Sequence, residues 1–105
     1  MELFHVVQVS NLEQFKKYIK ESCIERQLSS ILNKKSGDSL LHHAAKHGKT
    51  DILEWLHEFN FLPTEQGNFD GKKALHEASQ HSHIHCIKYL LSKGANVDAL
   101  KKADW

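Results

Sequence analysis

Apolar residues in the middle of the chain recur at helical spacing in two short blocks. Within each block they stand at positions that share one face of a helix: Leu41, Ala44 and Ala45, and then Ile52, Leu53 and Leu56. Such spacing is typical of short amphipathic helices. Gly48 lies between the blocks, where a helix can end in a residue with positive φ. The pattern therefore predicts a helix, a tight turn and a second helix.

Polar residues beside these blocks predict where the helices begin. We expect Thr50 to cap the second helix through its hydroxyl group. Near the N-terminus, Ser10 and Glu13 form an S-x-x-E capping box ahead of another apolar block. The run from Cys23 to Ser36 is rich in Lys, Ser and Asn, so we expect a long connecting loop there.

The helix-turn-helix pattern is repeated along the chain. GDSLLHHAAKHGKTDILEWLHEF starts at Gly37 and GKKALHEASQHSHIHCIKYLLSK starts at Gly71, which is an offset of 34 residues. A degenerate copy precedes them at an offset of 38 residues, with Val6 and Val7 in place of the two central alanines. The chain therefore holds three related units.

Three such units predict an all-helical solenoid in a single domain, residues 1–105. The approximate repeats are 1–35 as a degenerate N-terminal cap, 36–69 and 70–103, with the start of a further repeat at 104–105. Helices of fewer than about ten residues are marginal alone, because nucleation costs more than so few hydrogen bonds return. Neighbouring repeats must therefore stack to bury their apolar faces.

The residues of the last unit resemble the ankyrin repeat. The pattern D-G-x-T-P-L-H-x-A-A-x-x-G-H, followed by x-x-I-V-x-x-L-L-x-x-G-A-x-x-N, is matched by Asp70, Gly71, Leu75, His76, Ala78, His83, Ile87, Leu90, Leu91, Gly94, Ala95 and Asp98. The T-P pair is Ser39 and Leu40 in the second unit and Lys73 and Ala74 in the third, so the hydroxyl that pairs with the repeat's His is kept at Ser39 and lost at Lys73. The resemblance implies an ankyrin repeat solenoid with hairpin-like loops, acting as a protein-binding module.

Three segments are similar to the N-terminal repeats of one member of this family. They are LLHHAAKHG, KKALHEAS and ALKKADW. That member is a co-regulator of alanyl-tRNA synthetase, which binds the catalytic domain of the synthetase and accepts wrongly activated serine on lysine side chains. The similarity implies alanyl-tRNA synthetase as the partner, a role in limiting serine mischarging, and Lys102 as an acyl acceptor.

Lys102 also provides a catalytic alternative to simple binding. An amine accepts an activated acyl group only when it is deprotonated, which requires a lowered pKa or a very high local concentration of the acyl donor. Repulsion from Lys101 would lower the pKa of Lys102, whereas Asp104 would oppose this effect. The chain has no G-x-S-x-G, H-E-x-x-H or glycine-rich phosphate loop, so we expect it not to be an enzyme.

Composition narrows the classes of function. The 14 Lys and Arg residues against 13 Asp and Glu leave a net charge of +1, which argues against direct binding of nucleic acid. No apolar run approaches the roughly 20 residues that span a bilayer, and no secretion signal opens the chain. The two cysteines, Cys23 and Cys86, are expected to be free thiols. We therefore expect a cytoplasmic or nuclear protein that does not bind membranes.

Nine histidines raise the question of a metal site. His81, His83 and His85 form an H-S-H-I-H run, and imidazole is a good ligand for Zn, Cu and Ni. We expect His81 to end one helix, His83 to lie in the turn and His85 to begin the next helix, so the three rings should not converge. His42 and His76 are expected to be structural, bonded to backbone or hydroxyl groups. We therefore expect no metal or other cofactor, and a metal site based on the His run stays the alternative.

Candidate binding residues follow from the geometry of a stacked array, in which the loops and first helices form one continuous concave face. They are Lys46, His47, Phe69, Lys72, Lys73, Gln80, His81, Lys101 and Lys102. Phe69 and Trp105 are apolar residues at turn positions and could serve as interface anchors, although packing under a neighbouring repeat is favoured for Trp105. A third interpretation is an inactive fragment of a longer repeat protein.

Overall fold

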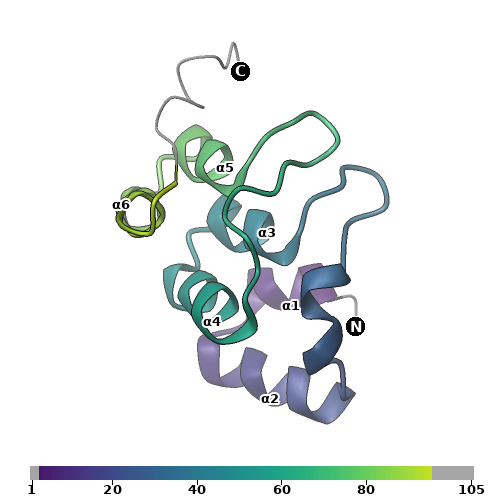
Figure 1. Ribbon diagram of the computed structural model, residues 1–105. Helices are drawn as coiled ribbons and strands as arrows, with labels where there is room; N and C mark the ends of the chain where they lie inside the picture. The colour runs from purple at the N-terminus through teal and green to yellow at the C-terminus, as the bar shows by residue number, and fades with distance from the viewer. Residues whose placement is uncertain (1–2, 96–105) are drawn as a thin grey trace.

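The computed structural model describes residues 3–95, which form helices in three stacked pairs. The elements are α1 (Leu3–Val9), α2 (Leu12–Ser22), a 3-10 helix η1 (Glu25–Ser30), α3 (Leu40–Lys46), α4 (Thr50–Asn60), α5 (Ala74–Gln80) and α6 (Ile84–Ser92). Figure 1 shows α3 between α1 and α5, while α2, α4 and α6 make a second row. Within residues 3–95 the only β pairing is an isolated antiparallel bridge between Leu32 and Ser39. The predicted all-helical solenoid is confirmed.

Small residues allow the first helices of successive repeats to approach closely. Ala44, Ala45, Ala74 and Ala78 are all buried on α3 and α5. The larger apolar side chains fill the space between the two rows, and those that are fully buried include Phe15, Ile19, Leu53, Leu56, Leu75 and Leu90. Burial of a side chain of this size stabilises the fold by about 1.5–3 kcal/mol. Since each repeat contacts mainly its neighbours, this core is continuous along the stack.

Two predicted helix caps are wrong by one residue. The cap of α2 is Asn11, whose Oδ1 accepts the Gln14 N–H at 2.9 Å, while the Gln14 Oε1 accepts the Asn11 N–H at 3.0 Å. The capping box is therefore N-x-x-Q and not the expected pair of Ser10 and Glu13. Thr50 is the first residue of α4 and not its cap, and its hydroxyl lies 3.1 Å from the Cys86 sulfur.

The predicted long loop between Cys23 and Ser36 is also partly wrong. Cys23 ends α2 in the left-handed conformation, with φ of 56°, and η1 then follows. Leu28 is 1% exposed and packs into the core, which explains why this polar segment is folded onto the stack. Leu28 is the one buried residue of η1, and a single apolar residue shows no helical periodicity.

The two tight turns within the helix pairs have the same backbone geometry but different residues. Gly48 has φ of 71°, which confirms the positive φ predicted there, and Ser82 has φ of 59°. The residue after each turn bonds back to the preceding helix: Lys49 N–H to the Ala44 carbonyl and His83 N–H to the Ala78 carbonyl, both at 2.9 Å. A side chain disfavours this conformation, so Ser82 carries strain that Gly48 avoids.

Replacing Ser82 by glycine should therefore stabilise the protein. We expect Ser82→Gly to raise the free energy of unfolding by about 1 kcal/mol, measured by thermal or urea unfolding. Ser79→Gly is the matched control, since Ser79 is exposed inside α5 and glycine should there destabilise the helix. A Ser82→Gly protein that melts at or below the temperature of the parent would contradict the argument.

Candidate protein-binding site

The loops that precede α3 and α5 project from the same side of the stack (Figure 1). They are joined to each other, because the Phe69 N–H donates to the Ser36 carbonyl at 2.9 Å and the Asn68 side-chain amide donates to Asp38 at 2.8 Å. We call the surface formed by these loops and the first helices, α1, α3 and α5, the inner face. Of the candidate residues that the structure describes, Phe69, Lys72 and Lys73 lie in the second loop. Lys46, His47, Gln80 and His81 lie at the C-terminal ends of α3 and α5.

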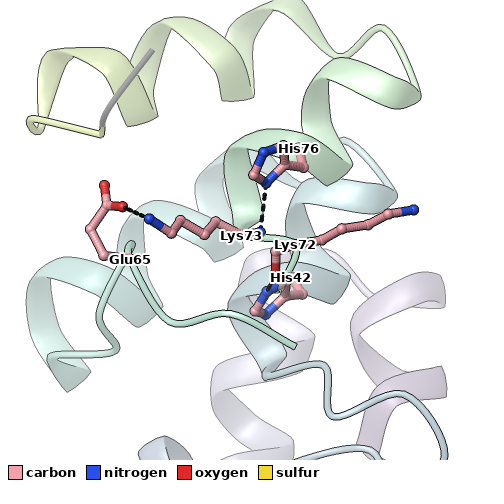
Figure 2. A network of polar contacts seen from close by, with 5 residues as sticks. All are labelled: His42, Glu65, Lys72, Lys73 and His76. Atoms are coloured by element: carbon pink, nitrogen blue, oxygen red, sulfur yellow. Dashed lines mark hydrogen bonds and ion pairs between the residues drawn. The ribbon is translucent and has the colours of Figure 1, made fainter. Parts of the chain in front are cut away.

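Buried histidines fix the loops to the helices. The His42 ring is 1% exposed, and its Nδ1 accepts the Ser39 N–H at 3.1 Å. Its Nε2 therefore carries the proton and donates to the Lys72 carbonyl of the next repeat at 2.7 Å, as Figure 2 shows. His76 is 3% exposed, and its Nδ1 accepts the Lys73 N–H at 2.8 Å. Both rings thus lie where the structural interpretation predicts, and the Ser39 hydroxyl lies 2.9 Å from the His42 Nδ1.

The two lysines of the second loop extend in opposite directions (Figure 2). Lys73 reaches Glu65 with an Nζ to Oε2 distance of 2.9 Å, and both side chains are partly exposed. An ion pair of this kind contributes less than about 1 kcal/mol to stability. The Lys72 side chain points away from that pair. The charge of Lys73 is thus partly used within the chain.

Phe69 is an exposed aromatic residue at the tip of the second loop. Its side chain is 69% exposed, while one edge of the ring lies over Gly37. A Cβ atom at Gly37 would come within 2.5 Å of the Phe69 ring, and Gly37 has φ of 76°. The glycine therefore provides space for the ring, which is held in place and still open to a partner. Partly supported, exposed aromatic residues are common anchors of protein interfaces.

A group of rings lies at the other end of α3 and α5. The His43 and His47 rings are 4.5 Å apart between centroids, and the His81 and His83 rings are stacked at 6.4 Å with an angle of 7°. Partial burial lowers the pKa of His47 from its ordinary value of 6.5. Nearby positive charges lower this pKa further, and they come from Lys46, His81, His83 and Lys49. His47 is therefore close to His81 and His83 of the next repeat.

Sequence reasoning missed this convergence across the repeats. His43 is not among the predicted candidates, and the stacking of His81 on His83 is not predicted either. The available signal was the repeat offset, because His47 and His81 stand 34 residues apart at equivalent positions. His83 bonds to the preceding repeat, its Nε2 donating to the Lys46 carbonyl at 2.9 Å. Within residues 3–95, no group of three or more His, Cys, Asp or Glu side chains is arranged to hold a metal ion.

The other candidate residues differ in their exposure to solvent. Gln80 and His81 are exposed, and Lys46 and His47 are half-buried. Lys101, Lys102 and Trp105 lie outside the described residues. Cys23 and Cys86 are both free thiols, as expected. Cys23 is exposed, whereas Cys86 is fully buried, and this burial raises the pKa of its thiol. No helix within residues 3–95 has the length and apolar character needed to cross a bilayer.

Comparison with known proteins agrees with this architecture. A family model of ankyrin repeats matches residues 3–101 in three copies, so the chain belongs to the ankyrin repeat family. Synphilin-1 of Mus musculus is 39% identical over 62 residues, which is 56% of this chain and 6% of that protein. The chain thus spans only a small part of this relative's length.

Two solved structures share the fold. A chain of the complex between the predatory endopeptidase Bd0816 of Bdellovibrio bacteriovorus and its immunity protein Bd3460 has a TM-score of 0.75 and 25% identity, covering 91% of this chain and 47% of that one. A chain of the complex between the yeast ribosomal protein Rps3 and its chaperone Yar1 has a TM-score of 0.77 and 20% identity, covering 89% of this chain and 68% of that one. These likenesses confirm the repeat fold.

Loss of the His83 ring should weaken the contact between the second and third repeats. We expect His83→Ala to lower the free energy of unfolding by about 1 kcal/mol, because the Lys46 carbonyl loses its donor. The matched control is His85→Ala, which removes an exposed ring at the start of α6. Urea unfolding of both variants measures the difference, and equal stabilities would show that the bond contributes nothing.

Stability should also depend on pH through His47. Its pKa is lower in the folded than in the unfolded chain, so the unfolded chain binds more protons as the pH falls below about 6.5. The contribution of His47 is thus fully present above that pH and is lost as the pH falls towards the folded pKa. We expect His47→Gln to lose less stability than the wild type between about pH 7.5 and about pH 5.5, measured by urea unfolding at each pH. A steeper loss in the variant would reverse the sign of the argument.

Proposed function

We propose that the chain is a non-catalytic module that binds another protein through the inner face. The observation that carries this proposal is the rigid support of the second loop. The buried His42 holds the Lys72 carbonyl, and the first loop holds the backbone of Phe69. An anchor that is already ordered before binding loses little conformational entropy when the partner arrives. Phe69 and Lys72 are therefore suited to recognition.

The solved structures with the same fold support a binding role. They come from complexes of an endopeptidase with its immunity protein and of a ribosomal protein with its chaperone. In both cases a repeat fold of this type occurs in an assembly of two proteins. The family match and the absence of a catalytic motif in the sequence point in the same direction.

The finer proposal concerns the identity of the partner. The segments LLHHAAKHG, KKALHEAS and ALKKADW are similar to the N-terminal repeats of ankyrin repeat domain-containing protein 16. On this basis we infer that the partner is the catalytic domain of alanyl-tRNA synthetase, in the cytoplasm or the nucleus. Lys102 would then act as an acyl acceptor. Its neutral amine would attack the carbonyl carbon of seryl-adenylate, and AMP would leave as the amide bond forms. The nitrogen would lose one of its two protons to solvent.

The inner face is tested by a pair of matched phenylalanine variants. Phe69 and Phe59 are equally exposed, at 69%, but Phe59 lies on the outer helix α4. We expect Phe69→Ala to weaken binding to purified alanyl-tRNA synthetase by about tenfold, and Phe59→Ala to leave it unchanged. Isothermal calorimetry measures the affinities, and the melting temperatures show whether each variant is folded. The opposite order of effects would place the binding site on the outer helices.

The acceptor role of Lys102 is tested in the same complex. With the synthetase, ATP and serine present, mass spectrometry should find a seryl adduct on Lys102 in preference to Lys101, Lys72 and Lys73. Lys102→Arg should abolish the adduct and keep binding, because the charge stays while the nucleophilic amine is lost. Equal labelling of all four lysines would reduce the reaction to non-specific acylation. Failure to bind the synthetase would contradict this partner, and Phe69-dependent capture of another protein from a cell lysate would then identify a different one.

A further inference from the structure

The rings of His43, His47, His81 and His83 form a histidine cluster that spans two repeats. His43 and His47 come from one helix, with their ring centroids 4.5 Å apart. The edge of His43 also packs against Phe4 of α1 at a centroid distance of 5.4 Å. His81 and His83 come from the next repeat and stack on each other. The cluster therefore depends on the correct stacking of α1, α3 and α5.

Two of the rings have one nitrogen bonded to a backbone carbonyl. His81 Nδ1 lies 3.0 Å from the Glu77 carbonyl, and His83 Nε2 lies 2.9 Å from the Lys46 carbonyl. A carbonyl oxygen only accepts, so each of these nitrogens carries a hydrogen. The other nitrogen of each ring, Nε2 of His81 and Nδ1 of His83, lies outside these bonds, and Nδ1 of His83 lies against Gly48.

The charged side chains that act on the His47 ring are all positive. α1 contributes His5, α3 contributes Lys46 and has no carboxylate, and Lys49 follows in the turn. The packed helices also carry carboxylates: α4 has Asp51, Glu54 and Glu58, and α5 has Glu77, which is 7% exposed. Asp51 accepts the N–H of Ile52, and Glu58 pairs with Lys93. None of these carboxylates is among the groups that shift the pKa of His47, whereas Lys46 and Lys49 are. His85, at the start of α6, is not among them either.

We propose that the histidine cluster, together with Lys46 and Lys49, binds an acidic segment of the partner protein, and that this binding takes up protons. The proposal rests on the proposed binding function of the inner face and adds the chemistry of the partner and its regulation. A carboxylate placed against the cluster supplies a negative charge, which is not found among the groups that act on His47. Carboxylates next to imidazole rings favour the protonated form, so binding and protonation reinforce each other.

The sign of the pH effect follows from this coupling. In the free protein, partial burial lowers the pKa of His47, and positive neighbours lower it further. An acidic segment raises the proton affinity of the cluster, so the complex holds more protons than the separate molecules. Affinity must then increase as the pH falls through the range in which imidazoles titrate, near about 6.5. An acidic polypeptide is favoured over nucleic acid because the whole chain has a net charge of only +1.

The proposal is tested with a defined probe. The probe is a fluorescein-labelled peptide of about twelve alternating Asp and Ser residues, whose carboxylates stay ionised above about pH 5. Fluorescence anisotropy with the wild-type chain should show binding that is about tenfold tighter at about pH 5.8 than at about pH 7.5. A peptide of alternating Asn and Ser controls for uncharged contacts and should not bind. Equal affinity of the acidic peptide at the two pH values would overturn the proposal.

Variants locate the effect on the cluster. The double variant His47→Gln and His81→Gln should lose the gain in affinity at low pH, while His85→Gln should keep it. Thermal unfolding of each variant shows that it is folded, and the single variants provide the measurement if the double variant is not. The proposal would be overturned if folded His47→Gln and His81→Gln proteins kept the gain in affinity at low pH. It would also be overturned if a single-stranded RNA of equal charge bound more tightly than the acidic peptide.

The outcome can be separated from that of the proposed function. The acidic peptide is a probe of the cluster alone, whereas the Phe69→Ala comparison measures binding of a whole partner to the inner face. Peptide binding without pH dependence would remove the present inference and leave the binding module intact. A Phe69→Ala variant that binds its partner normally would contradict the proposed site even if the peptide bound as expected.

Discussion

The rest of this structure depends on hydrogen bonds from side chains of one repeat to the backbone of a neighbouring repeat. The buried His42 ring donates to the Lys72 carbonyl and thereby fixes the second loop against α3. At the other end of the helices, His83 donates to the Lys46 carbonyl and Lys49 donates to the Ser10 carbonyl. Without these bonds, helices of seven residues would stack only through non-directional apolar contacts, which do not fix their orientation.

The equivalence of Lys49 and His83 shows how a repeat tolerates different chemistry at one position. They are 34 residues apart, and each reaches the carbonyl group at the end of the preceding first helix. The flexible lysine stem needs little space, whereas the His83 ring lies over Gly48, where a Cβ atom would come within 2.6 Å of Nδ1. Gly48 therefore serves both the left-handed turn and the packing of the next repeat.

Periodicity along the chain is sufficient to predict the helix pairs and the tight turn at Gly48. The structural role of His42 and His76 follows instead from the rule that buried polar groups are hydrogen-bonded. The helix caps were missed by one residue, because Ser10 and Asn11 are adjacent and both suit a cap. Leu28 could not be placed, since a single apolar residue in a polar run has no period. The histidine cluster depends on distances between repeats. A repeat offset indicates which positions are equivalent but not that their rings meet.

Burial decides which of two roles a histidine has in this fold. His42 uses both ring nitrogens in bonds to the backbone and is closed to solvent, so its proton belongs to the scaffold. His83 is only half-buried, and its bond to the Lys46 carbonyl joins the third repeat to the second. Its ring therefore links two repeats while part of it stays open to solvent. The same residue type thus serves as an enclosed support at position 42 and as a link near the surface at position 83.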